Sequence, residues 1–244
     1  MADRFTIPTM NHDSATAPAS TRDMEREEEA LRRHYSRNPY PELTFEFTRD
    51  PGLLHQYYRI RSDEYKAVHR VHLLATEGEE DRGSHILVVR RDNFCVGGIR
   101  INTRNPRKNY LLPIEIADFR LEKHFPQLLH GQMGYCQFGA LVLLPEFRGA
   151  GITTELFRRV HNKAVALNCK MMFLFAPVFM VEHYRQIFIS LRLKATIHYE
   201  IDLPTYPNLE EFQNHLVSVV TDESLVGKPA DFLINSENKS LTEA

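Results

Sequence analysis

Between residues 135 and 203, the spacing of apolar residues switches repeatedly between two patterns. Residues 135–144, 170–176 and 194–203 form apolar or β-branched runs of strand length. Residues 152–168 and 180–191 instead place apolar side chains three and four positions apart, which is typical of amphipathic helices. Strands that alternate with such helices predict an α/β (α+β) fold with a mixed central sheet flanked by helices.

The upstream half extends this pattern. Residues 53–74 have the periodicity of an amphipathic helix. The residues that recur three and four positions apart include Tyr57, Tyr58, Arg61 and Tyr65. Residues 86–89 and 95–101 predict a β-hairpin that turns at Asp92 and its neighbour. A connecting segment with a short helix at residues 117–123 follows.

The two ends of the chain lack such periodicity. Residues 1–20 are rich in Ala, Thr, Ser and Pro, which predicts a disordered tail. From Thr21 an acidic and then basic stretch predicts a short solvated helix. With 43% hydrophobic residues in 244, we expect a single domain over residues 21–222 and a flexible tail over residues 223–244.

Composition excludes several classes of function. The formal net charge is −2 without a long basic run, so we expect no nucleic-acid partner and no binding to an anionic membrane surface. Because no signal-peptide pattern or apolar run of spanning length occurs, we expect a cytoplasmic protein without a membrane span. Three cysteines in apolar surroundings predict buried, reduced thiols.

Histidines raise the question of a metal site. His69 and His72 lie about one helical turn apart, but no second pair of ligands with a zinc-binding spacing accompanies them. We therefore expect no metal and no permanently bound cofactor.

The segment PEFRGAGITT at residues 145–154 joins a predicted strand to a predicted helix. A glycine-bearing turn before a helix directs several amides and the positive end of the helix dipole at one point, where an anion can bind. Gly149 and Gly151 allow close approach to the main chain, and Arg148 adds a positive charge. The spacing fits neither the nucleoside-triphosphate loop nor the dinucleotide fingerprint. An ordinary tight connection is the alternative interpretation.

This loop, with its flanking strand and helix, resembles the acyl-CoA motif of the GCN5-related N-acetyltransferase (GNAT) superfamily, Q/R-x-x-G-x-G/A. Arg148 and Gly151 match the motif, and Thr153 stands where Gly or Ala is usual. The resemblance implies a GNAT-like, mostly antiparallel sheet and an acyl-CoA or acyl carrier protein as co-substrate. The residues that it assigns to the donor site are Leu141, Leu143, Arg148, Gly149, Ala150, Gly151, Ile152 and Thr153.

The same resemblance assigns the proton transfers. By its position on the following helix, Tyr184 corresponds to the tyrosine that protonates the departing thiolate. The backbone near Leu141 and Leu143 is suited to stabilising the oxyanion of the tetrahedral intermediate. Our first candidate for the general base is Glu115, with His124 and Glu182 behind it, and simple surface exposure is the alternative for each.

Three upstream segments resemble the autoinducer synthases and the long-chain N-acyl amino acid synthases: RSDEY at residues 61–65, VGGIRI at 96–101 and LPIE at 112–115. This branch delivers a fatty acyl chain to an amine. Gln137 and Ala140 stand where these families have glutamate and arginine. Arg61 and Arg100 lie among apolar residues, so each is expected to hold either a substrate carboxylate or a structural acidic partner.

Arg158, Arg159 and Lys163 follow the loop and predict either contact with a carrier protein or the ribose phosphate of CoA, or an ordinary solvated helix face.

The predicted function is an N-acyltransferase that moves an acyl group to the amine of a small metabolite or amino acid. The alternatives are an ordinary acetyl-CoA-dependent N-acetyltransferase, a non-catalytic acyl-CoA-binding module of the same fold, and a scaffold without a ligand.

Overall fold

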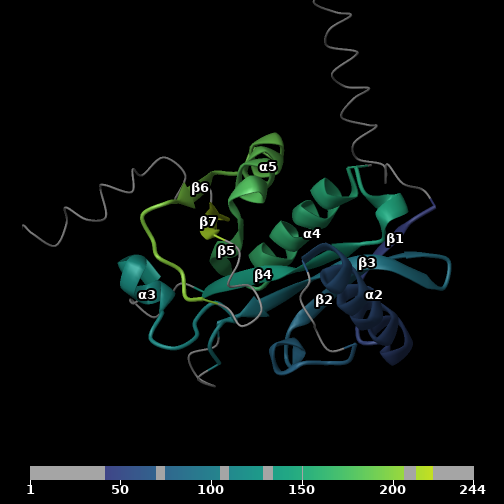
Figure 1. The fold of residues 1–244 in the computed structure, drawn as a ribbon. Helices are drawn as coiled ribbons and strands as arrows, with labels where there is room; N and C mark the ends of the chain where they lie inside the picture. The colour runs from purple at the N-terminus through teal and green to yellow at the C-terminus, as the bar shows by residue number, and fades with distance from the viewer. Residues whose placement is uncertain are drawn as a thin grey trace, which may run out of the picture. The chain divides into compact units, whose positions relative to one another are not determined.

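The computed structural model describes residues 42–69, 75–104, 110–128, 134–149, 151–205 and 213–221. The predicted N-terminal tail, the charged helix from Thr21, the C-terminal tail from residue 223 and Ala150 lie outside these ranges. The described strands form one seven-stranded sheet in the order β1-β2-β3-β4-β5-β7-β6. Neighbouring strands are antiparallel except β4 and β5, which are parallel. The predicted mixed, mostly antiparallel sheet flanked by helices is confirmed (Figure 1).

The strands are β1 Thr44–Thr48, β2 His85–Arg91, β3 Phe94–Thr103, β4 Gly134–Leu143, β5 Cys169–Pro177, β6 Ala195–His198 and β7 Asn214–Val220. The α-helices are α2 Pro51–His69, α3 Leu121–His124, α4 Ile152–Ala166 and α5 Val178–Ser190. Single 3-10 turns occur at η1 Glu79–Asp81, η3 Pro126–Leu128 and η4 Pro145–Phe147.

Helix α2 begins where local chemistry favours it. The carboxylate of Asp50 accepts a hydrogen bond from the amide of Leu53 at 2.8 Å, and Pro51 occupies the first helical position. Tyr57 and Tyr58 project from α2 onto the sheet, where they join a buried cluster made of Ile86, Val88, Cys95 and Val142. Helix α4 lies on the opposite face of the sheet from α2 (Figure 1).

The structure differs from the predicted elements in four places. Strands β1 and β7 were not predicted, and β6 covers only four residues of the predicted strand at 194–203. The short helix α3 begins four residues later than the predicted helix at 117–123 and ends just after it. β7 takes its place between β5 and β6, so its stability comes from partners distant in the sequence.

Strand β4 changes the faces of its side chains part of the way along. Gly139 pairs with Arg100, and Val142 pairs with Gly98, so β4 has one more residue than β3 between these pairs. This is a β-bulge, and within it Ala140 has a positive φ of 52°. The extra residue reverses the alternation, which is why Val142 packs against α2 although Phe138 packs against α4.

The bulge is fixed from α2. The hydroxyl of Tyr57 donates a hydrogen bond to the carbonyl oxygen of Ala140 at 2.7 Å. Tyr57 is fully buried, so this bond satisfies two polar groups that would otherwise be costly to bury.

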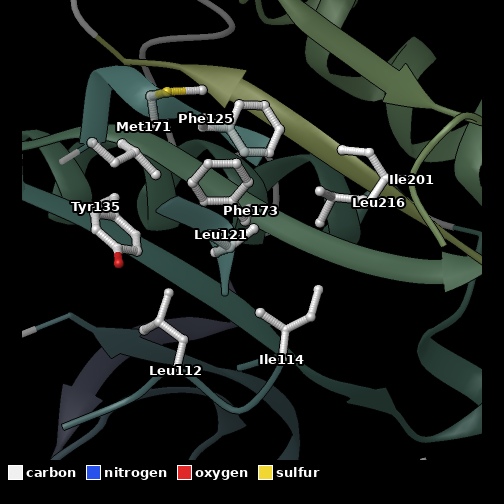
Figure 2. Close-up of a cluster of buried hydrophobic side chains, with 10 residues drawn as sticks. Leu112, Ile114, Leu121, Phe125, Tyr135, Met171, Phe173, Ile201 and Leu216 are labelled. Carbon is white, nitrogen blue, oxygen red and sulfur yellow. The ribbon is translucent and has the colours of Figure 1, made fainter. Parts of the chain in front are cut away.

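A second buried cluster covers β4, β5 and β7 (Figure 2). Figure 2 shows the ring of Phe173 in the middle of this cluster, with Phe125 and Leu121 beside it. The rings of Phe125 and Phe173 lie 4.9 Å apart. Residues that precede β4 in the sequence, including Leu112 and Ile114, thus cover the same sheet that β4 joins.

We expect Gly97→Ala to destabilise the fold strongly. A Cβ atom at Gly97 would lie 2.3 Å from the carbonyl oxygen of Val142, and the φ of 155° is unfavourable for a side chain. The free energy of unfolding, measured by urea denaturation, should fall by about 2 kcal/mol or more.

Gly139→Ala is the matched control for this substitution. No atom lies within 4 Å of a Cβ built at Gly139, so its effect should stay below about 1 kcal/mol. Equal losses for the two variants would contradict the close packing of β3 on β4.

Candidate active site

Strands β4 and β5 separate halfway along their length. Their parallel pairing runs from Gly134 to Gln137 on β4, whereas β5 continues to pair with β7 as far as Pro177. A cavity of about 440 Å³ occupies the space between the separated strands and the helices around them. Its lining comes from α2, β3, β4, the loop before α4, α4, β5, α5 and the first residue of β7, and includes Ile99, Phe138, Leu174, Phe175, Phe179 and Met180.

The separation leaves backbone amides of β4 directed at the cavity. The amide of Leu144 donates to the carbonyl of Val96 on β3 at 2.9 Å. Because consecutive amides of a regular strand point in opposite directions, the amide of Leu143 points away from β3, to the side of β5. Leu143 lines the cavity, and so does Leu141, which follows the bulge residue Ala140.

The loop before α4 leaves the start of the helix without a side-chain cap. Gly149 and Gly151 have φ values of 77° and 75°, which glycine adopts without strain. Gly151 is the N-cap residue, and no side chain bonds to the first turn of α4. Within the described residues, the amides of Gly149, Gly151, Ile152 and Thr153 have no hydrogen-bond acceptor. A helix start of this kind can accept an anionic ligand.

The amide of Arg148 does not belong to this open group. It donates to the carbonyl of Pro145 at 3.1 Å, closing the η4 turn, so only the side chain of Arg148 is available to a ligand. The side chain of Arg148 lines the cavity and is 44% exposed. Its Nε donates to the carbonyl of Leu143 at 3.0 Å, and its Nη2 forms an ion pair with the carboxylate of Glu64 on α2.

Tyr184 lies on α5 and lines the same cavity. Its ring packs edge to face on that of Phe157, with the centroids 5.3 Å apart. Burial and then the charge interaction with Tyr65 raise the pKa of Tyr184, so its phenol keeps its proton at neutral pH. The hydroxyl of Tyr184 lies 4.0 Å from Sδ of Met180, which also lines the cavity, so Tyr184 brings a neutral phenol to the cavity lining.

Four other polar residues of the cavity were not predicted as site residues: Glu64, Tyr65, His183 and Asn214. Glu64 and Tyr65 belong to α2, and burial raises the pKa of Tyr65. His183 precedes Tyr184 on α5, and the centroids of their rings are 6.1 Å apart. The available signals were the position of His183 beside Tyr184 and the segment RSDEY at residues 61–65, which contains Glu64 and Tyr65.

Glu115 does not line the cavity. It is 2% exposed, and its carboxylate accepts hydrogen bonds from the amides of Leu112 and Leu121 at 3.0 and 3.2 Å. Nearby, Gln137 accepts a bond from the amide of Ile114 at 2.8 Å. Both side chains thus fix the segment before β4, and we do not retain Glu115 as the base.

The two further candidates for the base also lie outside the cavity lining. The ring of His124 stacks on Phe119. Glu182 is exposed, and hydrogen bonds from Arg185 and then Gln186 lower its pKa to about 2, which makes it a weak proton acceptor.

The structure brings Arg61 and Arg100 together on a buried carboxylate. Asp81, 1% exposed, accepts two bonds from Arg61 at 2.8 and 2.9 Å and one from Arg100 at 2.9 Å. Burial by itself raises the pKa of Asp81, but the bond and charge of Arg61 and the charge of Arg100 hold it below the ordinary value. Neither arginine lines the cavity. Of the two expectations, the structural acidic partner is the one observed.

The basic cluster on α4 is partly neutralised. Arg158 and Arg159 both donate to Glu155, and Arg159 and Lys163 also lie over the rings of Phe45 and Phe47. These contacts favour the interpretation of an ordinary helix face over a dedicated carrier-protein surface.

The described residues provide neither a metal site nor an exposed cysteine. Across the described ranges, no group of three or more His, Cys, Asp and Glu side chains is arranged to hold a metal ion. His72 lies outside those ranges. All three cysteines are buried and free, and the hydrogen bond that the Cys136 thiol donates to Cys169, together with burial, raises the pKa of Cys136. No helix in the described part of the chain has the length and apolarity that crossing a bilayer requires.

Among solved structures, the chain is similar to FeeM, an N-acyl amino acid synthase from uncultured soil microbes, with a TM-score of 0.53 and 10% identity. That match covers 73% of this chain and 95% of FeeM. The AHL synthase LasI matches at a TM-score of 0.48 and 13% identity, covering 74% and 90% of the two chains. An N-acetyltransferase from Staphylococcus aureus Mu50 matches at 0.47 and 10%, covering 74% and 99%. At these identities the likeness concerns the fold.

No curated protein sequence matches this chain. The profile of the acetyltransferase (GNAT) family matches residues 53–184, which is more than half of the chain. The match includes Tyr184 and the loop at residues 145–154, which we call the donor loop. The cavity between β4 and β5, the uncapped start of α4 and this match lead to one conclusion: the chain belongs to the acetyltransferase (GNAT) family and is an acyltransferase.

Proposed function

We propose that this protein transfers an acyl group from acyl-CoA or acyl carrier protein to the amine of a small metabolite or amino acid. The observation that carries the proposal is the uncapped first turn of α4 at one end of an apolar cavity. The open amides of Gly149, Gly151, Ile152 and Thr153 suit the phosphate groups of a pantetheine carrier. The cavity between the separated strands suits the pantetheine arm and its thioester.

A fatty acyl chain is the acyl group that this cavity favours. Its walls include the side chains of Ile99, Phe138, Leu174 and Phe175, which are apolar and offer no hydrogen bonds. Burial of each methylene of an acyl chain against such walls contributes about 0.8 kcal/mol. Acetyl would leave much of this apolar surface unused.

The chemistry requires three actions of the protein. The tetrahedral oxyanion is stabilised by backbone amides of β4 at Leu141 and Leu143, the lining residues beyond the point where β4 and β5 separate. Tyr184 donates a proton to the departing thiolate. The attacking amine loses a proton to water or to His183, whose imidazole lines the cavity, whereas the carboxylate of Glu64 is paired with Arg148.

The proposal is tested by incubating the purified protein with acetyl-, octanoyl- and hexadecanoyl-CoA and a panel of amino acids and other small amines. Mass spectrometry should detect N-acyl products together with free CoA, and the turnover should be larger for the longer acyl groups. A preference for acetyl-CoA would contradict the fatty acyl proposal. CoA binding without product for any amine would favour the non-catalytic module.

We expect Thr153→Asp to weaken the binding of CoA by tenfold or more. A carboxylate at this position would occupy the open amides of α4 and repel the diphosphate. Isothermal titration calorimetry with CoA measures the change. Thr153→Asn has nearly the same shape without the charge and should bind CoA within about threefold of the unmodified protein; equal weakening in both variants would argue against an anion at this position.

Tyr184→Phe should lower kcat by about 100-fold or more while leaving the KM for acyl-CoA nearly unchanged, because the hydroxyl acts on the leaving group in the transition state. The pKa of Tyr184 is raised, and its protonated form is the active one. Ionisation of Tyr184 should therefore cause no loss of rate below about pH 10. Initial rates of thiol release between pH 6 and 10 test both points, and a variant with unchanged kcat would remove Tyr184 from the mechanism.

We expect His183→Gln to lower kcat by about tenfold or more at neutral pH, since glutamine keeps a similar size but cannot accept the proton. Glu182→Gln is the neighbouring control, because Glu182 is exposed and bonded to Arg185. Thiol-release rates of the two variants should differ by the same factor. If His183→Gln retains the full rate, the amine loses its proton to water.

A further inference from the structure

The ion pair between Arg148 and Glu64 joins the donor loop to α2 inside the cavity. Both residues line the cavity, and they come from segments that are 84 positions apart in the sequence. The side chain of Glu64 is 16% exposed, whereas that of Arg148 is 44% exposed. The guanidinium is therefore the partner that is more open to solvent, and the carboxylate is the more buried one.

This pair changes the charge that the donor loop offers to a ligand. Arg148 is the only lysine or arginine among the described residues of the cavity lining, and Glu64 is the only carboxylate. With the two in contact, their formal charges cancel. The attraction of an incoming phosphate then depends on the amides of α4 unless the pair separates.

The hydrogen bonds of Arg148 allow such a separation. The Nε atom is bonded to the carbonyl of Leu143, whereas the contact with Glu64 involves only Nη2. Rotation of the guanidinium about the end held by Leu143 would exchange the carboxylate for a phosphate oxygen. The bond to β4 need not break during this exchange.

We propose that Glu64 competes with the donor's phosphate for Arg148 and thereby sets the affinity of the site for anionic donors. This inference rests on the proposed function, because it takes the start of α4 as the phosphate site. The carboxylate occupies the guanidinium in the free protein. Donor binding displaces it, and the freed carboxylate then faces the cavity, where it can attract a positively charged amine.

The test measures CoA binding to the full chain by isothermal titration calorimetry. Glu64→Gln retains the shape of the side chain but removes its charge, so it should bind CoA about fivefold more tightly. Asp63→Asn is the matched control, because Asp63 is the exposed neighbour on α2 and carries the same charge. It should change the affinity by less than twofold. Pantetheine, which has no phosphate, should bind both variants and the unmodified protein equally.

Arg148→Ala completes a double-mutant cycle. In that background Glu64→Gln should no longer alter the affinity for CoA, because the competition needs the guanidinium. Circular dichroism melting of each variant checks that it is folded. Glu64→Ala is a second variant that removes the carboxylate.

The possible results separate the two proposals. If Glu64→Gln and Glu64→Ala bind CoA with unchanged or weaker affinity while the unmodified protein binds it, the competition is refuted and the donor site stands. If the unmodified protein and all variants fail to bind CoA, the donor site itself is refuted, and the role of Glu64 with it.

Discussion

The separation of β4 from β5 is the constraint on which the candidate site depends. Paired strands satisfy each other's amides, so a ligand can reach those amides only where pairing stops. In this protein pairing stops after Gln137, next to the bulge at Ala140. The bulge turns β4, and the bond from Tyr57 to Ala140 keeps it turned. Leu141 and Leu143 follow the bulge residue Ala140, on the part of β4 that lines the cavity and is no longer paired with β5.

Two buried polar networks support this arrangement without lining the cavity. Asp81 joins Arg61 of α2 to Arg100 of β3, which ties the helix that carries Tyr57 to the central sheet. Glu115 and Gln137 hold the segment before β4 through its amides. Breaking either network by removing one partner would leave buried groups unpaired, at a cost of several kcal/mol. In the sequence, these residues look like catalytic ones, because charged groups among apolar neighbours occur both in buried structural networks and in active sites.

Local patterns were sufficient to predict much of the fold. The periodicity of α2, α4 and α5, the hairpin that turns at Asp92 and the glycines before α4 are all properties of short segments, and the structure contains each of them. The predictions failed where tertiary contacts decide. β7 owes its place to β5 and β6, and β1 is a five-residue edge strand with Glu46 at its centre.

The residues of the candidate site divide in the same way, into those that short segments of sequence predict and those that only tertiary contacts bring to the cavity. The loop glycines follow from a motif that is contiguous in the sequence, and Tyr184 follows from its position on the next helix; they line the cavity or adjoin it. Glu64, Tyr65, His183 and Asn214 were missed, because α2 and β7 bring their residues to the cavity only through packing and pairing with the sheet, and His183 has no motif of its own. Glu115 was assigned as the base from its neighbours in the sequence, yet its side chain turns towards the amides of its own segment.

Helix α4 begins at a glycine where many helices have serine, threonine or aspartate. The φ of 75° at Gly151 does not suit such a cap, because capping residues have extended backbone and a side chain is strained in the left-handed region. A capping side chain would also fill the place that the phosphate needs. The backbone at this one position therefore keeps the first turn uncapped, and a change that let a serine or aspartate cap it would remove the capacity to hold a donor.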